Sequence, residues 1–182
     1  GWLRSLTSLP LVVKGVRTAG DAQLCVAQGV DAILVSNHGG RQMDATLSSI
    51  ETLPEIVQSV NGRAEVYMDS GIRRGSDVLK ALALGARAVF IGRPIFWGLA
   101  VAGIEGTLQV LRILHNELDL AMGYCGITAV KQIDRTILDM PTNMSDRVPS
   151  YITEIRELAS LYDDGIITQT QFEAKKRRLL GL

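Results

Sequence analysis

Short apolar runs rich in valine and isoleucine alternate along the chain with longer segments of helical periodicity, and this alternation limits the possible folds more than any other feature. The runs cover residues 11–14, 31–36, 65–69 and 88–92, and a helical pattern follows each of them. Strands separated by helices predict a parallel sheet that helices cover. Four such βα units take about 120 residues, whereas a whole barrel needs about 250. The predicted α/β fold is therefore either a small open sheet or half of a (β/α)8 TIM barrel.

Capping and breaking residues mark the expected helix boundaries. Thr18 is the expected N-cap of the first helix, and Gly29 is expected to end it. In the second helix, over residues 47–60, Pro54 predicts an interruption or a restart. The helices after the third and fourth strands are expected over residues 76–85 and 104–126.

The chain changes character after residue 140. Residues 141–150 contain two prolines, polar side chains and no periodicity, so they predict a linker between a first domain over residues 1–140 and a second over residues 151–182. The second domain has apolar residues at helical spacing, a stop at Gly165 and a second helix start at Thr168, which predict a small C-terminal helical hairpin. Because about 30 residues bury too little surface to be very stable alone, we expect a partner or self-association.

Charge and cysteine content restrict the function classes. Nineteen basic and nineteen acidic residues give a net charge of zero, so nothing points to nucleic acid or an anionic membrane as partner. Cys25 and Cys125 lie far apart in the sequence and in no C-x-x-C pair, so we expect neither a disulfide nor a metal site. We therefore expect a reducing, cytoplasmic setting. No uninterrupted apolar run approaches the roughly 20 residues of a membrane span.

Polar or conformationally special residues follow all four expected strands. In parallel α/β folds the carboxyl ends of the strands converge, and functional groups gather there. A single charged residue at a strand end is more often merely solvated, but four sets together indicate a site. The residues are Lys14 after the first strand, Ser36, Asn37, His38 and Arg41 after the second, Asp69, Gly71, Arg73 and Arg74 after the third, and Gly92 and Arg93 after the fourth.

The stretches "DSGIRRGSD" and "IGRP" are typical of phosphate binding. Glycine-rich turns that lead into helices let backbone N–H groups approach an anion, and an adjacent arginine adds charge-assisted hydrogen bonds. The alternative is that the glycines only permit tight turns while Arg73 and Arg74 are solvated. Spacing alone leaves both interpretations open.

His38 and Arg41 suggest acid–base chemistry next to a carboxylate. Histidine is suited to proton abstraction near neutral pH, and the planar guanidinium three residues later can hold a carboxylate. A base beside a carboxylate anchor indicates chemistry on the carbon alpha to an acid group. The competing interpretation is an ordinary surface-loop histidine.

Longer motifs resemble one enzyme family. "LPLVVKGV", "VSNHGGRQMD", "DSGIRRGSDVLKALALGARAVFIGRPIFWGLA" and "ELDLAMGYCGITAVKQI" are similar to the FMN-dependent α-hydroxy acid oxidases and dehydrogenases, the glycolate oxidase and lactate dehydrogenase flavoproteins, over residues 2–139. The resemblance implies a TIM barrel that binds FMN and oxidises a small 2-hydroxy acid, with a histidine removing a proton and the flavin accepting the hydride equivalent. By matching positions, it implies His38 as the base, Arg41 as the substrate carboxylate clamp, Lys14 at the flavin N1/O2 edge, Ser36 as a flavin contact, and Asp69, Gly71, Arg73, Gly92 and Arg93 at the FMN phosphate.

This sequence departs from the family in two ways. Ser70 stands where the family usually has glycine, and its Cβ is expected to alter how closely the backbone nears the phosphate. The resemblance also covers only the last four βα units of the barrel. The tail, from "IRELASLYDDGIITQTQFEAKKRRLLGL", resembles the SHOCT module, which implies oligomerisation or interaction rather than catalysis.

Two functions therefore stay open from the sequence. One is an FMN-dependent 2-hydroxy acid oxidoreductase whose site is completed by another half barrel, either a second polypeptide or a second copy of this chain, since open strand edges need cover. The other is a non-catalytic module that binds FMN or phosphate and serves oligomerisation or interaction. A nucleotide-handling dehydrogenase with a similar phosphate loop is disfavoured, because no cysteine lies near His38.

Overall fold

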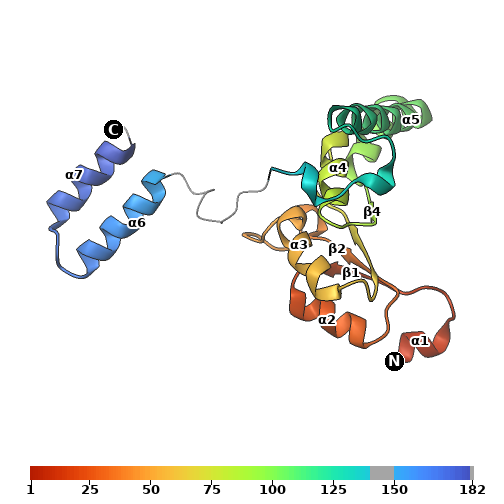
Figure 1. Cartoon of the computed structure of the whole chain (residues 1–182), viewed down its shortest axis with the longest axis horizontal. Coiled ribbons are helices and arrows are strands. Elements are labelled where there is room, and N and C mark those ends of the chain that lie inside the picture. The colour runs from red at the N-terminus through yellow and green to blue at the C-terminus, as the bar shows by residue number, and fades with distance from the viewer. Residues whose placement is uncertain (140–149, 181–182) are drawn as a thin grey trace. The chain divides into compact units, whose positions relative to one another are not determined.

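The computed structural model describes residues 1–139 and 150–180, which belong to two compact units, Gly1–Leu138 and Asp139–Leu182 (Figure 1). The linker expected over residues 141–150 lies outside the described residues, except for Ser150, which begins a helix.

The first unit consists of four βα units in chain order. Its strands form one parallel sheet in the order β1-β2-β3-β4, so that each strand pairs with its neighbours in sequence, as in a barrel. The predicted α/β class with four parallel βα units is confirmed. The elements are α1 (Trp2–Leu6), β1 (Val12–Val16), α2 (Ala19–Ala27), β2 (Ala32–Val35), the 3-10 turn η1 (His38–Gly40), α3 (Ser49–Val60), β3 (Glu65–Met68), α4 (Gly75–Ala83), β4 (Ala88–Val89), α5 (Arg93–Tyr124) and the 3-10 turns η2 (Val130–Gln132) and η3 (Arg135–Ile137).

The hydrophobic core lies between one face of the sheet and the helices that cover it. In β3, Val66 and Met68 are buried in this core, whereas Glu65 is exposed and Tyr67 is half-buried. The helices α2 and α3 lie side by side against the sheet (Figure 1). Fully buried side chains from the sheet and helices include Ile33, Val35, Leu53, Ile56 and Met68. The other face of the strands carries the polar side chains of Lys14 and Glu65 beside the buried apolar side chains of Ala32 and Leu34.

Helices α2 and α3 test two of the predictions made from capping and breaking residues. In α2 the Thr18 side chain accepts a hydrogen bond from the backbone N of Asp21 at 3.1 Å, which confirms that N-cap. The interruption expected at Pro54 is wrong, because α3 runs through it from Ser49 to Val60. A capping box of Ser48 and Glu51 fixes the first turn, and the buried apolar face holds the helix across the one missing donor.

Two further elements differ from expectation. The short helix α1 was not predicted, because its five residues are too few to show a periodicity. Strand β4 comprises only Ala88–Val89 instead of residues 88–92. It pairs with β3 alone, and within residues 1–139 no strand lies on its other side, so little holds it extended. The sheet therefore has two unpaired edges, along β1 and β4.

Helix α5 doubles back on itself. Ala102 and Gly103 leave the helical conformation, with φ 58° at Gly103. A Cβ built on Gly106 would lie 2.0 Å from the carbonyl oxygen of Gly98, a contact that a straight helix cannot make across eight residues. The element therefore consists of two helical arms pressed together at glycines.

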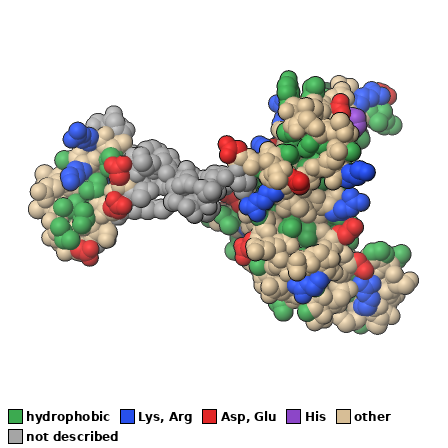
Figure 2. Space-filling model, in the orientation of Figure 1, with side chains coloured by type: hydrophobic (Ala, Val, Ile, Leu, Met, Phe, Trp, Pro, Cys, Tyr) green, Lys and Arg blue, Asp and Glu red, His purple; other side chains and the backbone are tan. Residues whose placement is uncertain are grey.

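The sequence offered no apolar run of membrane-spanning length. Helix α5 is nevertheless long and apolar enough to cross a membrane by length and composition, and it is the one such helix among the described residues. The reversal at Gly103 divides this length into two arms. Its exposed side chains include Phe96, Trp97, Leu99, Val101 and Ile104, and hydrophobic side chains are visible at the surface there (Figure 2).

The second unit contains the predicted helical hairpin. Helix α6 (Ser150–Asp163) and helix α7 (Gln169–Leu180) are joined by a turn in which Gly165 adopts φ 70°. The Thr168 hydroxyl accepts a hydrogen bond from the backbone N of Gln171 at 3.3 Å, which confirms the expected start of the second helix. The rings of Tyr162 and Phe172 stack with centroids 5.6 Å apart and join the two helices.

Helices α4 and α5 meet at a glycine. The backbone N of Gly75 donates to the Glu117 carboxylate at 2.8 Å, and Arg74 forms an ion pair with the same carboxylate at 2.9 Å. The hydrogen bond from Gly75, together with Arg74, lowers the pKa of Glu117. A Cβ on Gly75 would lie 2.1 Å from the backbone N of Leu118, so only glycine fits this contact.

Replacing Gly75 by alanine is therefore expected to separate α4 from α5. Overpacking of this kind costs about 1–3 kcal/mol, or roughly 3–10 °C in the thermal midpoint of a domain this size. The matched control is Gly123→Ala in α5, where a Cβ meets nothing within 4 Å and alanine favours the helix. Circular dichroism melts of the two variants test this, and equal midpoints would contradict the proposed contact.

Candidate functional site

The side chain of Lys14 joins the carboxyl ends of β2 and β3. Lys14 was expected to end the first strand, but β1 continues to Val16, so Lys14 lies in the middle of it. Its Nζ donates to the Ser36 hydroxyl at 2.9 Å and pairs with the Asp69 carboxylate at 3.2 Å. Lys14 belongs to β1, while Ser36 directly follows β2 and Asp69 directly follows β3. The hydroxyl of Ser36, which is fully buried, also accepts a hydrogen bond from the backbone N of His38 at 3.1 Å. The predicted strand-end residues are thus brought together by direct contacts.

His38 rests against an irregularity in β1. The register between β1 and β2 shifts between Lys14 and Val16, and the intervening Gly15 adopts φ 94°. A Cβ on Gly15 would lie 2.8 Å from Cε1 of His38, so the missing side chain makes room for the imidazole. His38 itself adopts φ 56°, a left-handed backbone conformation that residues other than glycine seldom adopt. The ring position is therefore set by backbone shape on both sides.

Arg41 lies in the exposed loop after the His38 turn. Its Nε lies 3.4 Å from the carbonyl oxygen of His38, a long hydrogen bond that leaves most of the guanidinium free. Further along this loop, the Leu47 carbonyl accepts a hydrogen bond from Arg17 at 2.9 Å. The base and carboxylate anchor suggested by the sequence therefore lie on one turn, tied back to the end of β1.

Two arginines lie on the other side of the site. Arg73 has its guanidinium carbon 4.9 Å from the ring centre of Trp97, and its Nη1 donates to the Ile72 carbonyl at 3.0 Å. Arg93 donates from Nη2 to the carbonyl oxygen of Gly39 at 2.8 Å. Each guanidinium is held in place while keeping further N–H donors.

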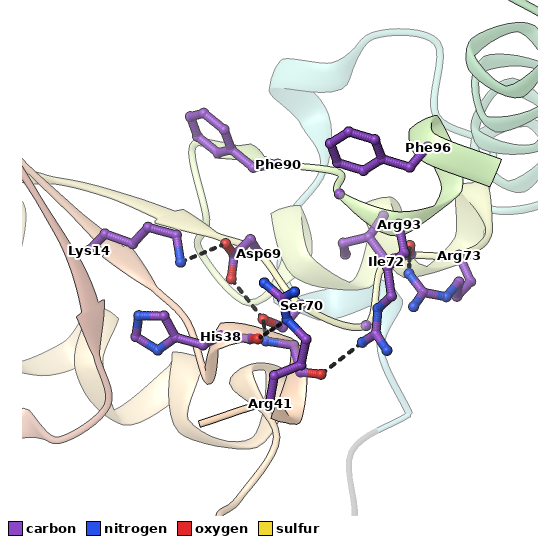
Figure 3. Close-up of a pocket in the computed structure, with 13 residues that line it drawn as sticks. Lys14, His38, Arg41, Asp69, Ser70, Ile72, Arg73, Phe90, Arg93 and Phe96 are labelled. Carbon is purple, nitrogen blue, oxygen red and sulfur yellow. Dashed lines mark hydrogen bonds and ion pairs between the residues drawn. The ribbon is translucent and has the colours of Figure 1, made fainter. Parts of the chain in front are cut away.

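These residues surround one cavity of about 270 Å³. Figure 3 shows Lys14 and His38 on one side of it and Arg73 and Arg93 on the other, with Phe90 and Phe96 above. The sequence-predicted strand-end residues line it with three exceptions. Ser36 contacts it through Lys14, and Asn37 and Arg74 are not part of its lining. The full lining is Lys14, His38, Gly39, Arg41, Asp69, Ser70, Gly71, Ile72, Arg73, Phe90, Gly92, Arg93 and Phe96.

The cavity carries excess positive charge. Asp69 pairs with Lys14, but across the part of the chain that the structure describes, Arg41, Arg73 and Arg93 form no ion pair with a carboxylate. Three cations gathered without neutralising partners repel one another unless an anion binds between them. The site is therefore built to receive negatively charged groups.

Several lining residues escaped the sequence interpretation. Phe90 was assigned to the fourth strand, and Phe96 lies between that strand and the helix expected after it; nothing in their spacing distinguishes them from core residues. Gly15 gave no signal either, because its contact is with a loop far along the sequence. Ser70 was noticed only as a departure from the family glycine.

A family model described as FMN-dependent dehydrogenase matches residues 1–140, well over half of the chain. The chain belongs to this family. Residues 153–180 match a second family model, described as Short C-terminal domain, which agrees with the predicted SHOCT resemblance.

Named relatives agree with this membership. Over 137 residues the chain is 58% identical to 2-hydroxyacid oxidase 1 of Mus musculus, covering 75% of this chain and 37% of the mouse protein. Over 139 residues it is 52% identical to L-lactate oxidase of a Nostoc species, covering 76% of this chain and 38% of that protein. The chain thus spans well under half the length of the relatives that it matches.

Solved structures show the same partial coverage. A mandelate oxidase structure with (S)-2-phenylpropionate superposes with a TM-score of 0.71 at 50% identity, covering 73% of this chain and 40% of that one. A mandelate oxidase variant with the monooxide FMN adduct also gives a TM-score of 0.71, at 49% identity, covering 74% of this chain and 43% of that one. The four βα units therefore correspond to part of the oxidase barrel.

The contact between Gly15 and His38 can be tested with a matched pair of glycine variants. Gly15→Ala and Gly29→Ala both place a side chain at positive φ, but only at Gly15 does the new Cβ meet a neighbour. Each is expected to lose about 1–2 kcal/mol of stability from the left-handed conformation. Only Gly15→Ala is expected to shift the NMR resonance of the His38 Hε1 proton. An unmoved resonance in Gly15→Ala would show that the bulge does not seat the ring.

Proposed function

We propose that the chain provides the phosphate corner, the base and the carboxylate anchor of an FMN-dependent oxidase of small 2-hydroxy acids. The observation that carries this proposal is the group of three arginines, without carboxylate partners among the residues that the structure describes, on the same cavity as His38. FMN brings one anion, its phosphate, and a 2-hydroxy acid brings another, its carboxylate. The family membership and the similarity to 2-hydroxyacid and lactate oxidases support the same assignment.

The residues present fit an FMN phosphate. Gly71 and Gly92 lie beside Arg73 and Arg93, and a Cβ built on either glycine would meet nothing within 4 Å. An anion can therefore approach the backbone there, as it does at other glycine-rich turns. Gly71 adopts φ 86°, which favours glycine at this position. The two guanidinium groups supply charge-assisted hydrogen bonds.

Bound FMN would supply the acceptor for the two electrons of the oxidation. In this proposal Arg41 binds the substrate carboxylate and so orients the carbon that carries the hydroxyl. His38, three residues earlier, removes a proton from the substrate through its imidazole. Lys14 would bring a positive charge to the flavin ring, and Ser36 and Asp69 keep its ammonium group in place.

The site needs a second set of strands. The cavity of about 270 Å³ is below the usual range of ligand pockets, about 300–1,000 Å³. The edges of β1 and β4 are unpaired within residues 1–139, and Val12 and Phe90 expose about half of their surface, 48% and 50%. We propose that a complementary half barrel, on another polypeptide segment or a second copy of this chain, covers these edges, with the C-terminal hairpin promoting association.

The phosphate assignment predicts a preference for FMN over riboflavin, which has the same ring but no phosphate. The full chain is expected to bind FMN more tightly, and Arg73→Gln is expected to weaken FMN binding about tenfold or more while leaving riboflavin binding nearly unchanged. Flavin fluorescence titrations measure both affinities.

Arg63→Gln is the control for that titration. Arg63 donates to the Val60 and Ser59 carbonyls at the end of α3, outside the cavity, so its loss is expected to leave both affinities unchanged. Equal affinity of the unmodified chain for the two flavins would contradict a phosphate site.

The base assignment predicts that His38→Gln abolishes oxidation but keeps FMN. The chain is mixed with FMN, L-lactate or glycolate, and a separate polypeptide carrying the remaining part of the mouse 2-hydroxyacid oxidase barrel, without oxygen. Loss of the oxidised-flavin absorbance is expected with the unmodified chain and is expected to slow by about 10²–10⁴-fold with His38→Gln.

Each half alone serves as the control for this reconstitution.

The second candidate function, a non-catalytic flavin-binding module carried by its interaction domain, rests on the match of residues 153–180 to the Short C-terminal domain. FMN binding without any bleaching in the reconstituted mixture would favour this second function over the oxidase.

A further inference from the structure

Ser70 occupies a backbone conformation that disfavours serine. Its φ is 71°, in the left-handed region where a Cβ is sterically strained and glycine is not. Strained residues of this kind persist when their surroundings hold them, and they gather at functional sites. The side chain must therefore form contacts that glycine could not replace.

The Ser70 hydroxyl connects two loops of the cavity. It accepts a hydrogen bond from the backbone N of Gly39 at 2.9 Å and donates one to Oδ1 of Asp69 at 2.8 Å. Gly39 belongs to the turn after β2 that carries His38, and Asp69 follows β3. The other oxygen of Asp69 faces Lys14 at 3.2 Å. One hydroxyl thus bridges the histidine turn to the carboxylate that holds the lysine.

The peptide groups of Gly39 are held from two directions. Ser70 binds its N–H, while Nη2 of Arg93 binds its carbonyl oxygen at 2.8 Å. This support matters because Gly39, at φ 69°, is free to adopt other backbone conformations, and the adjacent His38, at φ 56°, is sterically strained. Without the serine hydroxyl, the N–H of Gly39 would lose its partner, and only Arg93 would still hold the peptide groups of Gly39.

We propose that Ser70 is a positioning residue that fixes the His38 turn and the Asp69 carboxylate relative to each other. It acts through Gly39 and Asp69 rather than by touching a substrate. Its effect on oxidation rests on the proposed function, but its effect on the loops does not. This gives the serine that replaces the family glycine a role in the geometry of the site.

The full chain without flavin tests this role through hydrogen exchange of the Gly39 amide, measured by NMR. Ser70→Ala and Ser70→Gly both remove the hydroxyl, and both are expected to speed exchange at Gly39 by about tenfold. Ser70→Gly also removes the left-handed strain, so its global stability is expected to exceed that of Ser70→Ala. Faster exchange at Gly39 in both variants, despite their different global stabilities, would show that the hydroxyl positions the turn rather than only stabilising the fold.

Ser59→Ala is the matched control. The Ser59 hydroxyl donates to the Ile56 carbonyl at 2.9 Å within α3, away from the cavity, so exchange at Gly39 is expected to stay unchanged. Unchanged exchange at Gly39 in Ser70→Gly would overturn the proposal. A rise shared equally by core amides would overturn it too. If Ser70→Ala does not fold, the Ser70→Gly result decides.

The reconstituted, flavin-loaded protein gives the second readout. Both Ser70 variants are expected to lower kcat several-fold with a smaller change in KM, because His38 is displaced while Arg41 still binds the carboxylate. Failure of the unmodified chain to bind FMN would refute the proposed function and leave the exchange result standing. If the unmodified chain turns over substrate and both Ser70 variants keep its Gly39 exchange rate and its kcat, only the role of Ser70 is refuted.

Discussion

One ammonium group organises the functional end of the sheet. Lys14 contacts a hydroxyl that follows β2 and a carboxylate that follows β3, so β1 is tied to the ends of both strands at a single point. Parallel pairing makes this possible, because it brings all carboxyl ends to the same edge. The carboxylate of Asp69 neutralises the lysine, and the three arginines around it keep their charge for incoming anions. Lys14 is paired with Asp69, whereas Arg41, Arg73 and Arg93 pair with no carboxylate among the described residues, so this edge of the sheet has positive charge available for an anion.

Local patterns predicted much of the fold. The alternation of apolar runs with helical periods indicated the four βα units, and Thr18, Gly165 and Thr168 marked helix boundaries that the structure has. Pro54 misled, because tertiary burial of its helix outweighs a single missing hydrogen bond. The length of β4 depends on neighbours rather than on its own residues, so its sequence alone could not reveal it.

The site was predicted only as far as residue chemistry allows. Cations, a histidine and glycine turns at strand ends indicated which groups take part. Their arrangement depends on contacts between distant segments, such as Gly15 with His38 and Ser70 with Gly39. All four of these residues adopt positive φ, and the sequence does not reveal backbone φ angles. The arrangement of the site residues could therefore not be predicted from the sequence alone.

The two sheet edges differ, and this difference has a consequence for assembly. Strand β1 has five residues and β4 has two, so an edge-to-edge contact between copies would join unlike surfaces. Contacts between unlike surfaces close into a ring at one particular rotation and otherwise continue as an open filament. With four strands from each of two copies, such a ring would contain the eight strands of a barrel. A two-residue edge offers few backbone groups to a passing strand, and this shortness disfavours runaway polymerisation.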